Sequence, residues 1–139
     1  MQLSVLDTAF GVGTGTGNDD RDAIQACLDA AASELNATVL FPSARYHLGS
    51  SVSAPTTSSS IALIGEAPTI KGSHIVVGFN GPAFNVAGTL FSVERLSMVG
   101  NRAQFPSARA FKFAKTTNTD DMDVRVRNVC LQEFGVAIE

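Results

Sequence analysis

Within residues 9–35, a glycine-rich loop and a run of acidic residues lead into a helical pattern of apolar and polar positions that covers residues 22–35. The apolar positions recur at steps of one, three or four residues: Ala23, Ile24, Cys27, Leu28, Ala31 and Leu35. Because a helix completes a turn every ~3.6 residues, these side chains share one face, and Asp22, Gln25, Asp29 and Ser33 share the other. The pattern predicts an amphipathic helix. We expect it to end at Asn36, a residue type that tolerates the left-handed conformation common at helix C-termini.

A glycine-rich loop precedes this helix, with glycine at every second position from Gly11 to Gly17. Glycine lets the backbone adopt positive φ or approach another segment closely. The loop lacks the Lys-Ser/Thr pair of a phosphate-binding loop, and a G-x-G-x-x-G motif begun at Gly11 or Gly13 would lack its third glycine. We therefore expect no nucleotide and no other cofactor.

Acidic residues lie between the loop and the helix. Asn18 and Asp19 offer side-chain oxygens to the unpaired N–H groups of the first turn, and Asp20 and Asp22 place negative charge where the helix dipole favours it. A carboxylate cluster for metal binding or acid–base catalysis is the alternative. Capping explains these residues more simply, so we expect no metal site.

Short β-strand patterns surround the helix. The alternation of Leu3 and Val5 predicts a short strand near the N-terminus, and the runs 38–41 and 46–48 predict two more. Residues 50–60 are rich in Ser, Thr and Pro and predict a surface loop that does not anchor the core.

Two elements recur in the same order after residue 61. Residues 91–98 and 124–131 have apolar side chains at the same positions, 33 residues apart, as in Phe91 and Val124. A second, apolar-x-apolar element recurs in residues 83–86, 110–113 and 135–138, where Val136 aligns with Phe111 and Phe111 with Phe84. The runs 61–63 and 75–77 resemble earlier, diverged copies.

Repeats made of short strands without intervening helices predict a β-solenoid, in which stacked coils bury inward apolar side chains. A β-sandwich or meander is the alternative, but a sandwich has no reason to repeat two different elements in one order. We predict a mainly β fold. Residues 1–37 would form the N-terminal strand, glycine loop and capping helix, and residues 38–139 the coils.

Composition excludes several functional classes. A net charge of −3 and an isoelectric point of about 5.3 leave no basic face for nucleic acid or a membrane surface. No run reaches the ~18 apolar residues of a membrane-spanning helix, and no signal peptide is recognisable. Cys27 and Cys130 lie in apolar patterns without metal-ligand spacing, so we expect buried free thiols.

A second acidic cluster, Asp120, Asp121 and Asp123, follows a polar loop and precedes a strand. Glycoside hydrolysis uses two carboxylates that flank a cleft, so these are the candidate catalytic residues; a solvated turn is the alternative. His47 and His74 have no nucleophile or ligand at a useful spacing, and we do not expect either to be catalytic.

The remaining charged residues of interest are predicted to lie at the surface. Arg102 and Arg109 bracket Phe105 in a long loop of the kind that can host a binding site. We expect five charged residues of the strands to point outward, where neighbouring coils let opposite charges pair: Glu94, Arg95, Arg125, Arg127 and Glu133.

Several short motifs follow one another in a fixed order. They are Phe10-Gly11, Gly17-Asn18-Asp19-Asp20, Ala23-Ile24-Gln25-Ala26, Val39-Leu40-Phe41-Pro42, Tyr46 and Ile61-Ala62-Leu63-Ile64-Gly65-Glu66. In this order they resemble the N-terminal segment of the pectate-lyase-like right-handed parallel β-helix superfamily, which includes polygalacturonase-like enzymes and many bacteriophage tailspike and depolymerase proteins. Residues 3–77 resemble this N-terminal segment through the motifs, and residues 83–139 resemble the superfamily only through their repeated short-strand pattern. One departure is Asn36-Ala37-Thr38, where the family usually has glycines.

The resemblance implies a right-handed parallel β-helix whose first coil is capped by the N-terminal amphipathic helix. The structural residues that it implies are Gly11, Gly17, Asp19, Asp20, Ile24, Leu28, Phe41 and Pro42. Residues 136–139 stop in mid-strand without a cap. We therefore expect a chain that is truncated at this end or docks on further coils.

By resemblance, the leading function is that of a phage tailspike or depolymerase, a homotrimer in the virion or outside the cell that binds or cleaves bacterial surface polysaccharide. If the whole protein is a polysaccharide lyase or glycoside hydrolase, we expect its catalytic residues outside this chain. One alternative is a fragment of a cellular pectate-lyase-like or polygalacturonase-like enzyme. Another is a virion connector without enzymatic activity.

Overall fold

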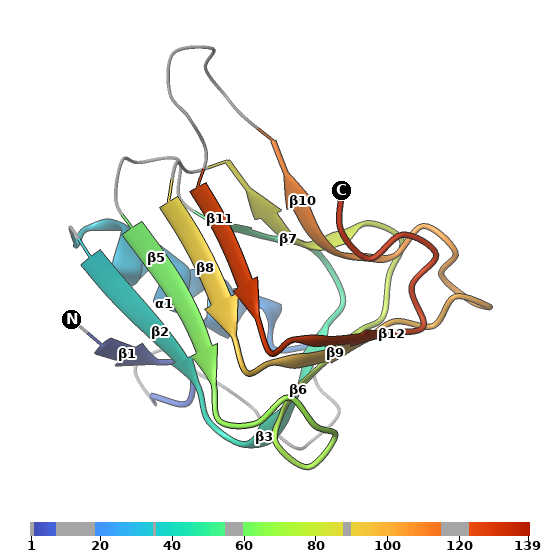
Figure 1. The fold of residues 1–139 in the computed structure, drawn as a ribbon, viewed down its shortest axis with the longest axis horizontal. Helices are drawn as coiled ribbons and strands as arrows, with labels where there is room; N and C mark the ends of the chain where they lie inside the picture. The colour runs from blue at the N-terminus through green and yellow to red at the C-terminus, as the bar shows by residue number, and fades with distance from the viewer. Residues whose placement is uncertain (1, 8–18, 35, 55–59, 88–89, 115–122) are drawn as a thin grey trace.

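The chain folds into stacked coils of short strands with one helix, α1 (Arg21–Ala32), as the computed structural model shows (Figure 1). The structure describes residues 2–7, 19–34, 36–54, 60–87, 90–114 and 123–139. The strands are β1 (Gln2–Ser4), β2 (Asn36–Phe41), β3 (Ala44–Leu48), β4 (Val52–Ala54), β5 (Ser60–Gly65), β6 (Ser73–Val77), β7 (Pro82–Val86), β8 (Leu90–Glu94), β9 (Ser97–Val99), β10 (Arg109–Phe113), β11 (Asp123–Arg127) and β12 (Cys130–Gln132). Within the described residues, no helix is long and apolar enough to cross a membrane.

Equivalent strands of successive coils stack into three sheets. The first sheet has the order β1-β2-β5-β8-β11, the second β3-β6-β9-β12 and the third β4-β7-β10. All the pairings between these strands are parallel. Each coil therefore visits the first, second and third sheet before the next coil begins, as in a parallel β-helix (Figure 1). The predicted solenoid is confirmed, because a sandwich is built from antiparallel sheets.

The 33-residue repeat in the sequence corresponds to the register in which strands of neighbouring coils pair. Val124 of β11 lies opposite Phe91 of β8, and Leu131 of β12 lies opposite Met98 of β9. The earlier run at Ile61 belongs to the same series, because Ile61 of β5 lies opposite Phe91. This register places like side chains above one another, so each coil extends the same apolar stripe.

The second repeat is confirmed between β7 and β10, where Phe84 lies opposite Phe111. Its last copy is shifted by two residues from the predicted alignment, because Phe111 bridges to Ile138 and not to Val136. Both alignments keep the alternation of inward and outward side chains, which has a period of two. The apolar pattern alone therefore could not separate them.

The prediction that residues 50–60 form only a surface loop is wrong. Strand β4 lies within them, pairs with β7, and buries Val52 and Ala54 in the core. A strand of three residues needs only two inward side chains, and two small apolar residues in a Ser-rich stretch supply them. Residues 55–59 lie outside the described part of the chain.

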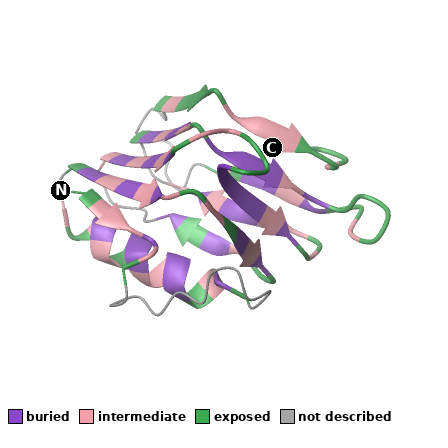
Figure 2. Ribbon diagram, turned by 90° about the horizontal axis from the view of Figure 1, so that it is seen from below, coloured by how far each residue is buried: buried purple, intermediate pink, exposed green. Residues whose placement is uncertain are grey.

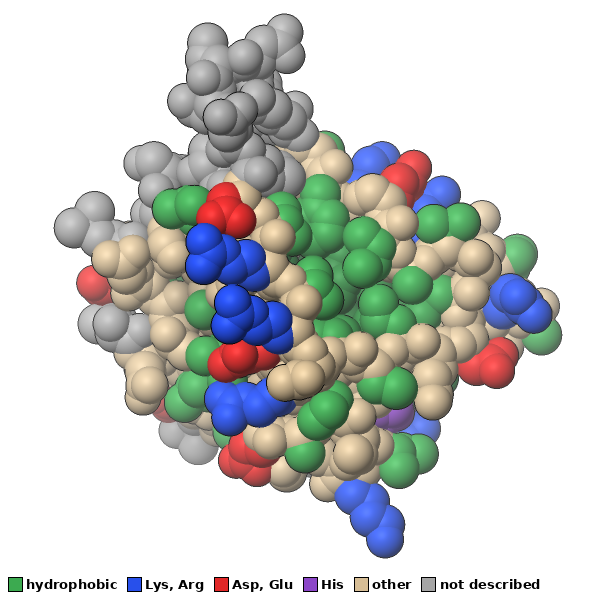
Figure 3. All heavy atoms as spheres, in the orientation of Figure 1, with side chains coloured by type: hydrophobic (Ala, Val, Ile, Leu, Met, Phe, Trp, Pro, Cys, Tyr) green, Lys and Arg blue, Asp and Glu red, His purple; other side chains and the backbone are tan. Residues whose placement is uncertain are grey.

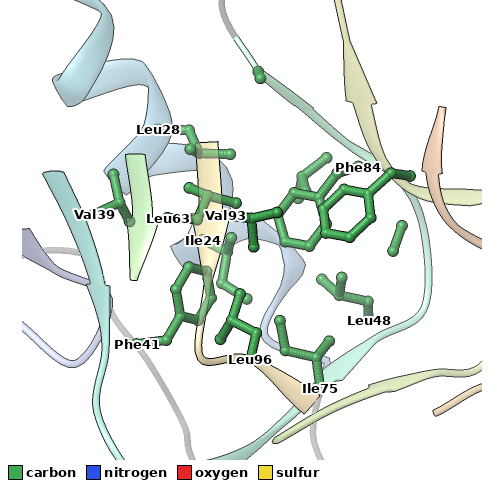
Figure 4. Close-up of a cluster of buried hydrophobic side chains, with 14 of the residues drawn as sticks. Ile24, Leu28, Val39, Phe41, Leu48, Leu63, Ile75, Phe84, Val93 and Leu96 are labelled. Carbon is green, nitrogen blue, oxygen red and sulfur yellow. The ribbon is translucent and has the colours of Figure 1, made fainter. Parts of the chain in front are cut away.

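Inward side chains from the coils form one continuous core (Figure 4). Val39, Leu63 and Val93 occupy one row of the first sheet, and all three are buried. Figure 4 shows Ile24 and Leu28 of α1 reaching toward this row. The helix and the coils therefore share the same hydrophobic interior.

Aromatic rings connect the coils across this interior. The ring of Phe41 lies 5.4 Å from that of Tyr46 and 6.4 Å from that of Phe84, both edge to face. The rings of Phe84 and Phe111 are stacked, with their centroids 5.5 Å apart. The hydroxyl of Tyr46 donates a hydrogen bond of 2.7 Å to the carbonyl of Pro42. Three coils are thus joined through side chains as well as backbone.

The helix α1 packs against β1, β2 and β4 and covers the N-terminal end of the coils (Figure 2). Its buried residues are Ala23, Ile24, Cys27, Leu28 and Ala31, the stripe that the sequence predicts. The predicted end at Asn36 is wrong, because α1 ends at Ala32 and Asn36 begins β2. The side chain of Ser33 instead turns back to the carbonyl of Ala30. Leu35 is outside the described residues.

Asp19 and Asp20 attach the start of α1 to β3. Asp20 N–H donates to the carbonyl of His47 (2.8 Å), and Asp20 Oδ2 accepts from His47 N–H (3.0 Å). Asp19 Oδ1 accepts from the N–H groups of Arg21 (3.0 Å) and Gly49 (3.1 Å). Asp19 therefore caps the helix as predicted, whereas Asp20 fixes it to the first coil. Gly11, Gly17 and Asn18 lie outside the described residues.

The two cysteines differ in burial. Cys27 is fully buried in α1, and burial, together with Asp7, raises the pKa of its thiol to about 11. Cys130 is only half-buried, because β12 belongs to the last coil, so the prediction of two buried thiols holds for Cys27 alone. Both thiols are free.

Candidate functional site

The outward face of the first sheet carries a groove that crosses several coils. Cavities of about 250, 190 and 300 Å³ open on this face. The first two share Ser92 and Arg125, and the second and third share Ile64. Side chains alternate along a strand, so the neighbours of each buried residue point into the groove. We call the surface formed by Ser60, Ile64, Ser92, Glu94, Arg125 and Arg127 the outer groove.

Charged side chains of both signs line the outer groove. Arg125 Nη2 lies 3.0 Å from Asp123 Oδ2, and Arg95 Nη2 lies 3.4 Å from Glu94 Oε1. Arg127 has no ion pair within the part of the chain that the structure describes. Figure 3 shows a column of basic and acidic side chains along this face. The side chains of Arg95 and Arg125 are 48% and 64% exposed, so water weakens both ion pairs and a ligand can reach both guanidinium groups.

One of the three candidate catalytic carboxylates can be placed. Asp123 begins β11 at the edge of the outer groove, and its two carboxylate oxygens accept hydrogen bonds of 3.4 and 3.0 Å from Arg125. Asp120 and Asp121 lie outside the described residues. The observed role of Asp123 is that of a counter-ion that orients Arg125, and its catalytic role stays a prediction.

A buried histidine–serine pair on the outward side of the second sheet was missed by the sequence reasoning. His74 Nδ1 lies 3.0 Å from Ser97 Oγ, and these residues are only 3% and 4% exposed. They lie opposite each other on β6 and β9. A serine hydroxyl beside a histidine ring can act as a nucleophile with the histidine as its general base. Here both side chains are buried, so a substrate cannot reach Ser97 Oγ or His74 Nδ1. We therefore assign this pair a structural role, and His74 is not the isolated residue that the sequence indicates.

Acidification is expected to destabilise the fold through His74. Burial, Arg45 and His47 lower the pKa of His74 below its ordinary value of 6.5. The unfolded chain then takes up a proton at a higher pH than the folded chain, so the free energy of unfolding falls as the pH decreases below 6.5 toward the folded pKa. Urea denaturation of wild type and His74→Asn across this range measures the effect. Equal pH dependence in the two proteins would contradict it.

The loop of residues 100–108, between β9 and β10, projects from the coils (Figure 1). It is fixed to the preceding coil, because Ser107 N–H donates to Asn80 Oδ1 (3.0 Å). Arg102 is exposed in this loop, whereas Arg109 begins β10 and forms an ion pair of 2.9 Å with Glu139. The two arginines therefore do not form one site.

The described residues contain no group of three or more His, Cys, Asp or Glu side chains that could hold a metal ion. Scans against protein-family models, curated proteins and solved structures gave no match. The function is therefore inferred from the coils and from the groove on their surface.

Proposed function

We propose that this chain is the N-terminal part of a bacteriophage tailspike or depolymerase β-helix that recognises or cleaves bacterial surface polysaccharide, in the virion or outside the cell. In this proposal the chain is mainly structural, because it begins the solenoid beneath α1. It also presents the outer groove to the glycan. The observation that carries the proposal is the extension of the groove over several coils, since a polymer needs a long contact surface.

The chemistry of the groove suits a carbohydrate. Sugar hydroxyls donate and accept hydrogen bonds, and the groove offers guanidinium donors from Arg125 and Arg127, a carboxylate acceptor from Glu94 and the hydroxyl of Ser92. The aliphatic side chain of Leu90 lies beside them and can contact the apolar C–H face of a sugar ring. Both kinds of contact are available on one surface.

Binding to oligosaccharides of bacterial capsules and O-antigens is the direct test. We expect Arg125→Ala and Arg127→Ala each to raise the Kd about tenfold or more, because a hydrogen bond from a charged donor contributes about 1.5–3 kcal/mol. Isothermal titration calorimetry measures the Kd. Lys71→Ala is the matched control, since Lys71 is exposed on the β5–β6 loop and does not line the groove. Equal losses in all three variants would contradict the proposal.

The same oligosaccharides separate the alternative functions. Preference for pectic fragments over bacterial glycans would favour a fragment of a cellular pectate-lyase-like or polygalacturonase-like enzyme. Binding to none of them would favour a virion connector. We expect this chain not to depolymerise the glycan that it binds, because the proposal places the catalytic residues on later coils. Release of reducing ends or unsaturated sugars by the purified chain would contradict that placement.

A further inference from the structure

The turn between β6 and β7 contains the sequence Asn80-Gly81. Of all the glycines in the chain, Gly81 alone follows an asparagine. Asn80 is exposed, and Gly81 adopts a φ of 143°, a conformation that residues with side chains rarely adopt. The backbone nitrogen that follows an asparagine can attack its side-chain amide, and a glycine puts no side chain in the way of this attack. The turn therefore holds an electrophile and a nucleophile next to each other.

Two hydrogen bonds join this turn to the next coil. Ser107 N–H donates to Asn80 Oδ1 (3.0 Å), and Arg109 N–H donates to the carbonyl of Gly81 (2.9 Å). The first bond fixes the side-chain amide of Asn80, and the second fixes the main chain of Gly81. Within the described part of the chain, Gly81 N–H itself has no hydrogen-bond acceptor. The nucleophilic nitrogen is therefore not engaged elsewhere.

The hydrogen bond from Ser107 is directed at the atom on which negative charge would develop. Attack on Cγ of Asn80 gives a tetrahedral intermediate whose charge lies on Oδ1. Donors that stabilise such an oxyanion act from about 2.7–3.1 Å, and Ser107 N–H already lies 3.0 Å from Oδ1. Because this donor belongs to the backbone of the neighbouring coil, it is in place before the reaction begins.

We propose that Asn80 is a site of spontaneous deamidation, promoted by Ser107 N–H. Gly81 N gives up its proton to water and forms a bond to Asn80 Cγ. The bond between Cγ and Nδ2 breaks, and Nδ2 takes up the proton and leaves as ammonia. Water then opens the cyclic imide at either of its two carbonyls. One product is aspartate, and the other is isoaspartate, in which the main chain runs through the former side chain. Water is the only other reactant.

Two other asparagines serve as internal references. Asn101 is also exposed, and its Oδ1 accepts a hydrogen bond of 3.2 Å from Gln104 N–H, so its amide has a donor similar to that of Asn80. It is followed by Arg102, whose side chain hinders attack by the backbone nitrogen. Asn85 is half-buried within β7, where strand pairing holds the backbone extended. We expect neither to react.

The two products affect the next coil differently. Aspartate keeps an oxygen that can accept from Ser107 N–H and adds one negative charge. Isoaspartate lengthens the main chain by one atom, so Ser107 and Arg109 both lose the acceptors that they have in this turn. The loop of residues 100–108 is then released at its C-terminal end. This inference is independent of the proposed glycan function, because the turn does not line the outer groove.

Peptide mapping by mass spectrometry tests the site in the folded chain after incubation at mildly alkaline pH. We expect residue 80 to gain about one mass unit, since OH replaces NH₂, and to appear as separate aspartate and isoaspartate forms. Fragment spectra should show Asn85 and Asn101 unchanged. Asn80→Gln is the matched variant, because it keeps a side-chain amide but would have to close a larger ring, and it should stay unmodified. An unmodified Asn80, or equal modification of Asn80 and Asn101, would overturn the proposal.

The chain unfolded in guanidinium chloride isolates the contribution of Ser107. Unfolding keeps the Asn80-Gly81 sequence and removes the hydrogen bond, so deamidation should be at least threefold faster in the folded chain. An equal or slower rate in the folded chain would overturn the role of Ser107. Limited digestion with trypsin measures the consequence. Cleavage after Arg102 should become faster as isoaspartate accumulates in wild type and stay constant in Asn80→Gln. Constant cleavage in both proteins would show that the loop is not released.

Discussion

Replacement of Phe41 by alanine is expected to lower the free energy of unfolding by about 3–5 kcal/mol, the usual cost of truncating a buried phenylalanine. Phe41 has no exposed surface. Its ring contacts those of Tyr46 and Phe84, so its removal leaves a cavity between the first and second coils. The rigid strands around it limit collapse into that space. Urea denaturation followed by circular dichroism measures the loss.

Ile70→Ala is the matched truncation at the surface. Ile70 is 70% exposed, so its removal should change the free energy of unfolding by about 0.5 kcal/mol or less. A similar loss in both variants, or a loss below about 1.5 kcal/mol in Phe41→Ala, would show that Phe41 does not lie where the coils meet.

Gly65→Ala is expected to lower the free energy of unfolding by nearly as much as Phe41→Ala. The expected loss lies at the upper end of the range of about 1–3 kcal/mol that is typical of an overpacked site. A Cβ atom at Gly65 would lie 2.1 Å from the carbonyl oxygen of Arg95 and 2.8 Å from Ser73 Cβ. The first of these atoms is backbone and cannot rotate away. Arg95, between β8 and β9, adopts a positive φ of 57°, and Asn128, at the equivalent place between β11 and β12, adopts a φ of 50°. The turn between the first and second sheets therefore has the same tight conformation in both coils.

Gly78→Ala provides the control for Gly65→Ala. A Cβ atom at Gly78 would meet only the carbonyl oxygen of Leu48, at 3.8 Å, an ordinary contact. We expect a change within about 0.5 kcal/mol in either direction. Thermal and urea unfolding of both variants separates the close approach of coils from the general effect of losing a glycine. Equal stabilities would mean that the coils do not approach closely at Gly65.

The sequence predicted those parts of the fold in which neighbouring coils repeat one apolar pattern. The register of Phe91 with Val124 follows directly from the repeat, because both positions must face the same core. Strand β4 could not be found in this way, since Val52 and Ala54 lie in a Ser- and Thr-rich stretch with no similar copy. The end of α1 was misplaced because Asn36 pairs with Ser60, a contact between segments far apart in the chain.

The candidate site was less predictable than the fold. Asp123 was identified as a carboxylate of interest, but its partner Arg125 and the cavities around it depend on which strands lie side by side. His74 and Ser97 are 23 residues apart, a spacing that differs from the 33-residue repeat because the loops of successive coils differ in length. Outward residues follow no apolar pattern, so only the folded chain brings them together.

Residues of successive coils lie side by side in parallel register, and both the core and the outer groove depend on this arrangement. Nuclear Overhauser effects in the isotope-labelled chain test this directly. We expect interstrand contacts between the backbone protons of Phe91 and Val124, Met98 and Leu131, and Phe84 and Phe111, in the pattern of parallel strands. Contacts in an antiparallel pattern between strands adjacent in the sequence, such as β8 with β9, would contradict it.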